Sequence, residues 1–386
     1  MPRQPRKGGT RPRLKGAAMV DRRYFTYFDW GLLALTFLLG LFGLMTLYSA
    51  VMAGVPTPQK ALFTKQLIWY GIGLGAMLFC LLFNYKLLER WGLVIYTVCV
   101  LMLVWVLVFG KYVGGARRWL VLGPVSLQPS ELVKVAVIIV LARYYAKYVS
   151  SRGFNLRGLQ IPAVLTLIPF VLILRQPDLG TGGLVVLIAA TMTLFVKIER
   201  RSLLLLTSSA VVMTFPLWLF VLKDYQKQRI LTLFNPEGDP LGTGYHIIQS
   251  KIAIGSGFMT GKGFLKGTQN ALSFLPEQHT DFIFSVLAEE WGFLGASILI
   301  VTFLVFIFWS LNIAFGCRDP FGTILAVGIT AMISWQFVIN IGMVMGLMPV
   351  VGVPLPFISY GGSSLLTTLI CVGILMNISM RRFMFE

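Results

Sequence analysis

Long uninterrupted runs of apolar residues leave this chain few folds to choose from. About 20 apolar residues in a helix span the hydrocarbon core of a bilayer, and with 56% hydrophobic and only 12% charged residues the chain has too many such runs for one soluble core. The sequence therefore predicts an all-α polytopic membrane protein. We expect ten transmembrane helices at about residues 29–51, 64–83, 91–110, 131–149, 161–177, 181–197, 203–222, 282–311, 322–346 and 358–379.

The distribution of basic residues predicts how these helices are oriented. Lys and Arg are enriched in short loops on the cytoplasmic side. Arg22, Arg90, Arg143, Arg157 and Arg381 all fall on one side if the N-terminus is inside. We therefore expect an N-in/C-in protein. The net charge of +18 is then explained by basic residues that set the orientation of the helices and attract anionic membrane lipids. We therefore expect no nucleic-acid partner.

The chain is expected to have three parts. Residues 1–28 form a basic cytoplasmic leader, of which 1–18 are expected to be disordered or an extension, because they lack the apolar core of a signal peptide. Residues 29–379 form the membrane domain, including a large extracytoplasmic loop at 223–281 between the seventh and eighth helices. Residues 380–386 are a short cytoplasmic tail. A loop of that length, with nearly balanced charge, indicates a functional site.

Asp281 is the leading candidate for a catalytic residue. It lies where the large loop meets the eighth predicted helix, and a carboxylate at such an interface can act as a general base. Capping of this helix is the alternative role, and the two roles can coexist. Glu277 and His279 are candidate helpers, or else a solvated loop charge and a packing histidine. Glu289 and Glu290, further into the helix, are interpreted as structural.

A second carboxylate lies at the start of the fourth predicted helix. Ser130 is expected to be its N-cap, and Glu131 in the first turn suits the helix dipole. Glu131 and Lys134 are i,i+3 neighbours, so we expect them to form an ion pair at the mouth of this helix.

Five further basic residues are candidates for binding an anionic headgroup. Arg117 and Arg118 are preferred because guanidinium groups suit phosphate oxygens. Lys251, Lys262 and Lys266 lie in the large loop, where solvated charge is the alternative explanation. With two histidines and no Cys/His cluster, we expect no resident metal. A divalent cation, Mg²⁺ or Mn²⁺, could enter with a substrate pyrophosphate.

Residues 348–364 are uncharged and hold three prolines and the pair Gly361-Gly362. This composition excludes a regular helix. Irregular backbone at membrane depth is tolerated where it lines a cavity, so we expect a cavity wall that faces outward.

Five motifs resemble the SEDS proteins of bacterial cell-wall synthesis, and the resemblance covers about residues 20–382 in the family's order. The runs at 244–255 and 267–269 resemble the elongation branch of the family more than its division branch. The motifs are GARRWL (115–120), QPSELVK (128–134), QPDLGT (176–181), LPEQHTDFIF (275–284) and MPVVGVPLPFISYGGS (348–363).

The resemblance implies a peptidoglycan glycosyltransferase of the bacterial cytoplasmic (inner) membrane. Such an enzyme polymerises lipid II into β-1,4-linked glycan, with inversion, on the outer face of that membrane during cell elongation and shape determination. It implies a class B penicillin-binding protein as the transpeptidase partner. It also implies that Asp281 is the essential aspartate, with Glu131 and Lys134 in supporting positions. A lipid II flippase or transporter and a non-catalytic scaffold for the penicillin-binding protein are the alternatives.

Overall fold

The structure is a computed structural model that describes residues 28–53, 60–113, 116–122, 125–148, 153–239, 242–272 and 278–381. The leader up to residue 27, Glu277 and the tail from residue 382 lie outside the described residues. The expected domain boundaries therefore stay predictions.

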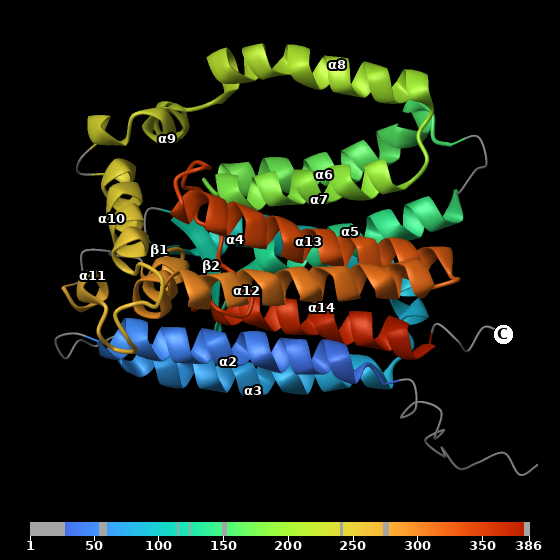
Figure 1. Cartoon of the computed structure of the whole chain (residues 1–386). Helices are drawn as coiled ribbons and strands as arrows, with labels where there is room; N and C mark the ends of the chain where they lie inside the picture. Colours follow the sequence, from blue (N-terminus) through green and yellow to red (C-terminus); the bar gives the residue numbers. More distant parts are fainter. Residues whose placement is uncertain are drawn as a thin grey trace, which may run out of the picture.

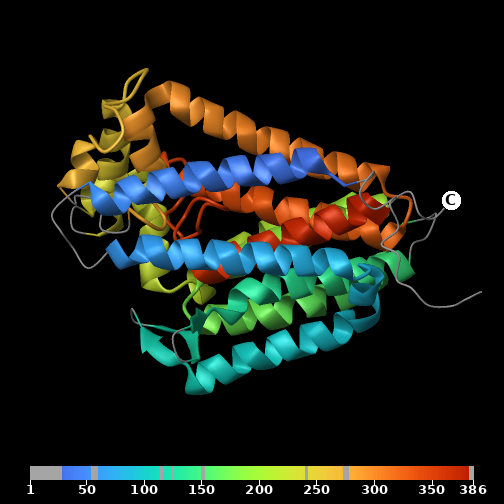
Figure 2. The same cartoon turned by 90° about the horizontal axis from the view of Figure 1, so that it is seen from below.

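Helices make up almost all of the described chain. Except for α8, the long ones lie side by side in a bundle, and short elements gather at one end of it, at the left of Figure 1. α8 lies apart from the bundle at the top of Figure 1, and none of its apolar stretch is buried inside the protein. Figure 2 shows the same arrangement from below. In chain order the helices are α2 (Trp30–Met52), α3 (Lys60–Leu82), α4 (Lys86–Phe109), α5 (Pro129–Lys147), α6 (Leu156–Arg175), α7 (Leu179–Phe195), α8 (Arg200–Pro216), the π-helix η1 (Leu217–Val221), α9 (Asp224–Phe234), the 3-10 helix η2 (Pro236–Gly238), α10 (Thr243–Ser256), α11 (Thr268–Ala271), α12 (Ile283–Gly316), α13 (Pro320–Val344) and α14 (Gly362–Arg381).

Eight helical stretches of the described chain are long and apolar enough to cross a membrane. They are α2, α3, α4, α6, α8 with the start of η1, α12, α13 and α14. The other two predicted spans correspond to α7, which is apolar but has only 17 residues, and to α5, which contains a buried ion pair. The chain is thus a nearly all-helical, multi-pass membrane protein.

The centre of the bundle is formed by α5, α13 and α14. In the apolar stretches of α13 and α14, 78% of residues are buried inside the protein, against 22% in α3. α13 packs against α5, α7 and α12, and α14 packs on α3. A helix that is apolar all round is stable against either lipid or protein, so hydropathy by itself does not show which helices are central.

A small sheet departs from the all-α prediction. Strands β1 (Lys111–Val113), β2 (Ala116–Leu122) and β3 (Val125–Leu127) pair antiparallel in the order β1-β2-β3, with Leu120 opposite Leu127. Gly-Gly follows β1 in the sequence and Gly-Pro follows β2, and such dipeptides mark turns. These short signals were present in the sequence but were not interpreted as a sheet.

α12 is interrupted near its N-terminal end. Gly292 has φ 64° and ψ −163°, which breaks the helical hydrogen bonding there. Residues 258–263 of the large loop fill the break, and their backbone forms four hydrogen bonds of 2.8–3.1 Å with residues 289–294. A methyl carbon placed on Gly292 would lie 2.3 Å from the backbone nitrogen of Gly261. Because Gly292 and Gly261 have no side chains, the backbone of the loop can approach α12 closely at the break.

Candidate functional site

The segments that carry the sequence motifs contact one another at one end of the bundle. Arg118, on β2, donates from Nε to the carbonyl of Gln176 at 3.0 Å and from Nη2 to the carbonyl of Pro177. Asp178 caps α7 by accepting from the backbone of Thr181. Its Oδ2 also accepts from the side-chain amide of Gln128 at 3.3 Å. Three of the motifs are thereby joined.

The uncharged segment 348–363 joins the same cluster. The backbone N–H of Gln128 donates to the hydroxyl of Ser363 at 3.0 Å. At the start of α7, Gly180 lies so close to this segment that a methyl carbon on it would be 2.4 Å from the carbonyl oxygen of Val351. The prediction that residues 348–364 form no regular helix is confirmed for 348–361, and residues 362–364 are the first residues of α14.

Asp281 lies at the junction of the large loop, α12 and this segment. The residue is half-buried, and a methyl carbon placed on Gly352 would lie 3.3 Å from Oδ2 of Asp281. Gly352 has φ 72°, a conformation that favours glycine. The N-cap of α12 is Phe282, without a side-chain capping bond. The alternative role of Asp281 as helix cap is therefore not supported.

The backbone around Asp281 is held from one side. Three consecutive carbonyl groups, those of residues 279–281, each accept a hydrogen bond from α13 or from the segment before α14. In that order the donors are the backbone N–H of Tyr360 at 2.9 Å, the hydroxyl of Ser359 at 2.6 Å and the side-chain amide of Asn340 at 2.9 Å. None of these three donors was singled out from the sequence.

The segment 348–361 carries backbone strain of its own. Phe357 has φ 64° although it is not glycine, and its side chain is buried. Such a residue costs on the order of 1–3 kcal/mol. The hydroxyl of Tyr70 donates to the carbonyl of Phe357, and Gly43 on α2 lets that carbonyl approach closely. Neighbouring helices therefore fix this strained conformation.

The predicted ion pair between Glu131 and Lys134 is confirmed. Nζ of Lys134 lies 2.9 Å from Oε1 of Glu131, and the side chains are only 1% and 5% exposed. The other carboxylate oxygen of Glu131 has no hydrogen-bond partner among the described residues. The predicted N-cap is wrong: α5 begins at Pro129, its N-cap is Gln128, and Ser130 is a buried residue of the first turn.

The two arginines of β2, Arg117 and Arg118, differ in their exposure and in their hydrogen bonds. Arg117 is exposed and donates to the carbonyl of Val108 at 2.9 Å, which leaves further donors of its guanidinium open. Arg118 donates to the carbonyls of Gln176 and Pro177, which connect α6 to α7. Both lie on β2, beside the cluster of motifs.

The loop lysines divide in the same way. Lys251 and Lys266 are exposed, and Lys251 lies against Gly346. Lys262 instead forms an ion pair of 2.6 Å with Glu289, whose side chain is 1% exposed. The expectation that Lys262 binds substrate is therefore not supported by its position. Glu290 accepts from the hydroxyl of Ser49 on α2.

His279 lies beside the segment that holds Asp281. Its ring centroid is 6.0 Å from that of Tyr360, and its carbonyl accepts from the backbone of that residue. The histidine therefore packs within the site, and a role as proton shuttle stays a prediction.

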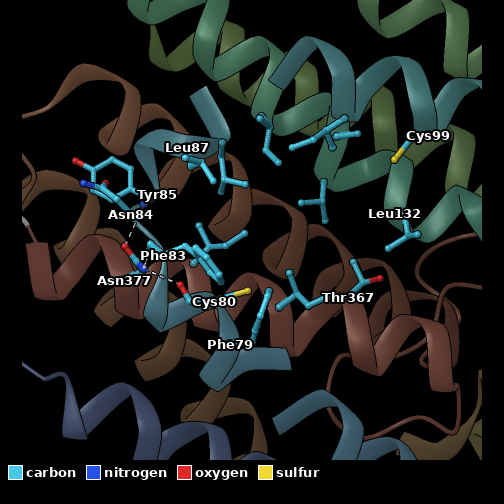
Figure 3. Close-up of a pocket in the computed structure, with 17 residues that line it drawn as sticks. Phe79, Cys80, Phe83, Asn84, Tyr85, Leu87, Cys99, Leu132, Thr367 and Asn377 are labelled. Atoms are coloured by element: carbon cyan, nitrogen blue, oxygen red, sulfur yellow. Dashed lines mark hydrogen bonds between the residues drawn. The ribbon is translucent and has the colours of Figure 1, made fainter. Parts of the chain in front are cut away.

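An apolar cavity of about 500 Å³ lies between α3, α4, α5 and α14. Figure 3 shows Leu132 and Thr367 at one end and Tyr85 and Asn377 at the other. Leu132 follows Glu131 directly in the sequence, so one end of the cavity reaches the first turn of α5. A long hydrocarbon chain with a polar head at the motif cluster would fit this arrangement.

In the described residues no group of three or more His, Cys, Asp or Glu side chains could hold a metal ion. The site holds the half-buried carboxylate of Asp281, the guanidinium groups of Arg117 and Arg118 on β2, and an apolar cavity that reaches the first turn of α5. This combination suits proton abstraction from an anionic, lipid-linked substrate.

Comparison with known proteins gives concordant results. A family of cell cycle proteins comprising FtsW, RodA and SpoVE matches residues 29–383. The peptidoglycan glycosyltransferase MrdB of Escherichia coli (strain K12) is 41% identical over 360 residues, which cover 93% of this chain and 96% of MrdB. The peptidoglycan glycosyltransferase RodA of Treponema pallidum (strain Nichols) is 34% identical over 426 residues, covering 92% of this chain and 98% of RodA.

A solved structure is similar over nearly the whole chain. It belongs to a peptidoglycan synthase complex and concerns the structural coordination of polymerization and crosslinking. The matching chain has a TM-score of 0.79 and 33% sequence identity, and the match covers 92% of this chain and 98% of that one.

Proposed function

Because this chain belongs to the family of FtsW, RodA and SpoVE, we infer that it is a peptidoglycan glycosyltransferase that polymerises lipid II during cell elongation. The observation that carries this conclusion is the meeting of the motifs around Asp281 at one end of a bundle of membrane helices. The activity is inferred from the relatives named above, and the location of the active site is inferred from the cluster of motifs.

The topology that suits this activity has ten spans, N-in/C-in, in the cytoplasmic membrane, with the motif cluster outside. α5 and α7 are then the fourth and sixth spans. The hydroxyl of Ser379, near the end of α14, donates to the carboxylate of Asp29 at the start of α2, at 3.1 Å. The described chain thus begins and ends at the same end of the bundle, which supports an even number of spans.

Asp281 acts as the general base in the proposed reaction. It accepts the proton from the 4-hydroxyl of the acceptor's N-acetylglucosamine while that oxygen attacks C1 of the donor's N-acetylmuramic acid. The bond between C1 and the pyrophosphate oxygen breaks, undecaprenyl pyrophosphate leaves, and inversion gives a β-1,4 linkage. Pyrophosphate leaves readily, so no second carboxylate is needed as an acid, unlike in glycoside hydrolysis.

Basic residues stabilise the leaving pyrophosphate in this scheme. Arg117 and Arg118 on β2 are the leading candidates, and Lys251 and Lys266 are assigned to the headgroup. Lys134 acts indirectly, by holding the carboxylate of Glu131 in place through their ion pair. A divalent cation bound through the pyrophosphate would add charge stabilisation, and removal of Mg²⁺ and Mn²⁺ with a chelator should then lower the polymerisation rate.

The cavity of Figure 3 is proposed to hold the polyprenyl tail of one substrate. Ile370→Trp would fill part of this cavity from α14, so it should raise KM for lipid II and leave kcat nearly unchanged. Leu304→Trp, on the exposed face of α12, is the matched control. Equal KM values for the two variants would remove the support for this assignment.

The proposed partner is a class B penicillin-binding protein that crosslinks the new glycan. The similarity to a chain of a peptidoglycan synthase complex supports this pairing. Adding the partner to the reconstituted chain should raise the yield of glycan, and an unchanged yield would argue against obligate coupling.

The central test is the polymerisation of purified lipid II by the reconstituted chain with its partner. Asp281→Asn should lower the rate by about 10²-fold or more, because it removes the base and keeps the shape. Glu237→Gln, an exposed carboxylate of the same loop, should keep the wild-type rate. Wild-type glycan yield from Asp281→Asn would overturn the assignment. Transport of labelled lipid II by the same proteoliposomes would then separate the transporter and scaffold alternatives.

A further inference from the structure

Asn340 is a buried polar residue in the apolar helix α13. Its side chain is 0% exposed, and its amide nitrogen Nδ2 donates to two carbonyl groups at once. One is the carbonyl of Asp281 at 2.9 Å, and the other is that of Val353 at 2.7 Å. A single amide group therefore connects the candidate base to the irregular segment before α14.

Loss of this amide would affect both carbonyls at once. The Asp281 carbonyl lies in the turn that leads into α12, and the Val353 carbonyl lies in irregular backbone beside the left-handed Gly352. A buried polar group that loses a hydrogen bond is destabilised. Without the Asn340 amide, the two backbones would lose the hydrogen bonds that join them through α13.

The position of Asp281 matters more than its mere presence. A general base must lie within hydrogen-bond reach of the proton that it removes, and a displacement of about 1 Å can lower a rate by about 10²-fold. The carboxylate of Asp281 lies against Gly352, next to one of the two carbonyls that Asn340 holds. The same amide therefore fixes the backbone of the base and the backbone of the segment beside it.

We propose that Asn340 is a positioning residue for Asp281, which holds the base in register with the segment 348–361. The proposal rests on the function inferred above, in which Asp281 removes the proton. It extends that function to a residue on another helix, which acts through Asp281 and touches no substrate.

Asn270 offers a matched control for a purely structural role. It is 1% exposed, and its Nδ2 donates to the carbonyl of Ser49 at 3.0 Å. In both asparagines the side-chain oxygen has no hydrogen-bond partner among the described residues. Asn270 thus has the same chemistry as Asn340 but contacts a carbonyl of α2.

The experiment compares Asn340→Leu with Asn270→Leu in the reconstituted lipid II assay. Asn340→Leu should lower kcat by about tenfold to 10²-fold and leave KM within about twofold. Asn270→Leu should lower the melting temperature and keep kcat. Equal kcat values for the two variants, whether both high or both low, would overturn the proposal. If Asn340→Leu does not fold, Asn340→Gln keeps the amide on a longer side chain and should give the same loss in kcat.

A second measurement does not depend on activity. Hydrogen exchange at Tyr360, whose N–H donates to the carbonyl of His279, should become faster in Asn340→Leu and stay unchanged in Asn270→Leu. Unchanged exchange in both variants would contradict the positioning role. Should Asp281→Asn remain active, the proposed function would fail, and the exchange result would still decide whether Asn340 holds this backbone.

Discussion

Glu131 and Lys134 are both buried, and burial makes each charge depend on the other. Taking either charge out of water costs several kcal/mol, which their attraction at 2.9 Å offsets only while both are present. Lys134→Met would leave Glu131 as an unpaired buried carboxylate. Removing both charges would avoid this cost.

We therefore expect Lys134→Met to lower the free energy of unfolding by about 3–5 kcal/mol. The double variant Glu131→Leu/Lys134→Met should lose much less stability, while losing activity if the pair supports the site. The control is Lys86→Met, because Lys86 is partly exposed and lies 3.7 Å from Asp319; it should change stability by less than about 1 kcal/mol. Denaturant unfolding in detergent micelles measures all three. A double variant as unstable as Lys134→Met would contradict this account.

Local spacing predicted this ion pair, because residues three apart on a helix are neighbours. Longer-range partners could not be predicted in the same way. Asn340 lies 59 residues from Asp281, and Lys262 lies 27 residues from Glu289. A lone asparagine in an apolar helix signals function or burial, but the sequence does not reveal what it contacts. The sequence likewise did not reveal that Lys262 pairs with Glu289, so Lys262 was predicted to bind substrate.

At the scale of elements, α12 shows how a loop can complete a helix. The apolar run at 282–311 predicted one continuous span, and nothing in the sequence distinguishes Gly292 from an ordinary helical glycine. The break becomes visible only with residues 258–263, whose backbone replaces the helical hydrogen bonds lost around Gly292. The break therefore anchors the large loop to the membrane domain.

Gly292→Ala should weaken this anchor. A side chain at φ 64° and ψ −163°, a region that essentially only glycine adopts, costs about 1–3 kcal/mol, and the new methyl group would also meet the backbone of Gly261 at 2.3 Å. We expect lower thermal stability and faster hydrogen exchange in residues 258–263. Gly255→Ala on α10 is the control, because a methyl group there meets nothing within 4 Å and alanine favours helix. Equal stability of the two variants would show that the loop does not depend on the break.

At the scale of the whole molecule, hydropathy predicted where the helices lie in the sequence but not which of them are buried inside the protein. α5 and α14 are surrounded by protein and α3 largely faces outward, yet all three read as apolar runs. The number of membrane crossings is a further step. α7, with 17 residues, is at the lower limit of about 17 for a span, so its crossing deserves a direct test.

Labelling at residues 157 and 237 tests this crossing, because Arg157 is in the first turn of α6 and Glu237 follows α7 and α8 in the chain. Three crossings put Arg157 and Glu237 on opposite sides of the membrane, and two crossings put them on the same side. In a chain whose four native cysteines are replaced by alanine, we introduce Arg157→Cys or Glu237→Cys, both at exposed positions. An impermeant maleimide added to intact spheroplasts should label Glu237→Cys at once, and Arg157→Cys only after permeabilisation. Labelling of both without permeabilisation, or of neither, would mean that α6, α7 and α8 do not all cross, and the ten-span topology would then be wrong.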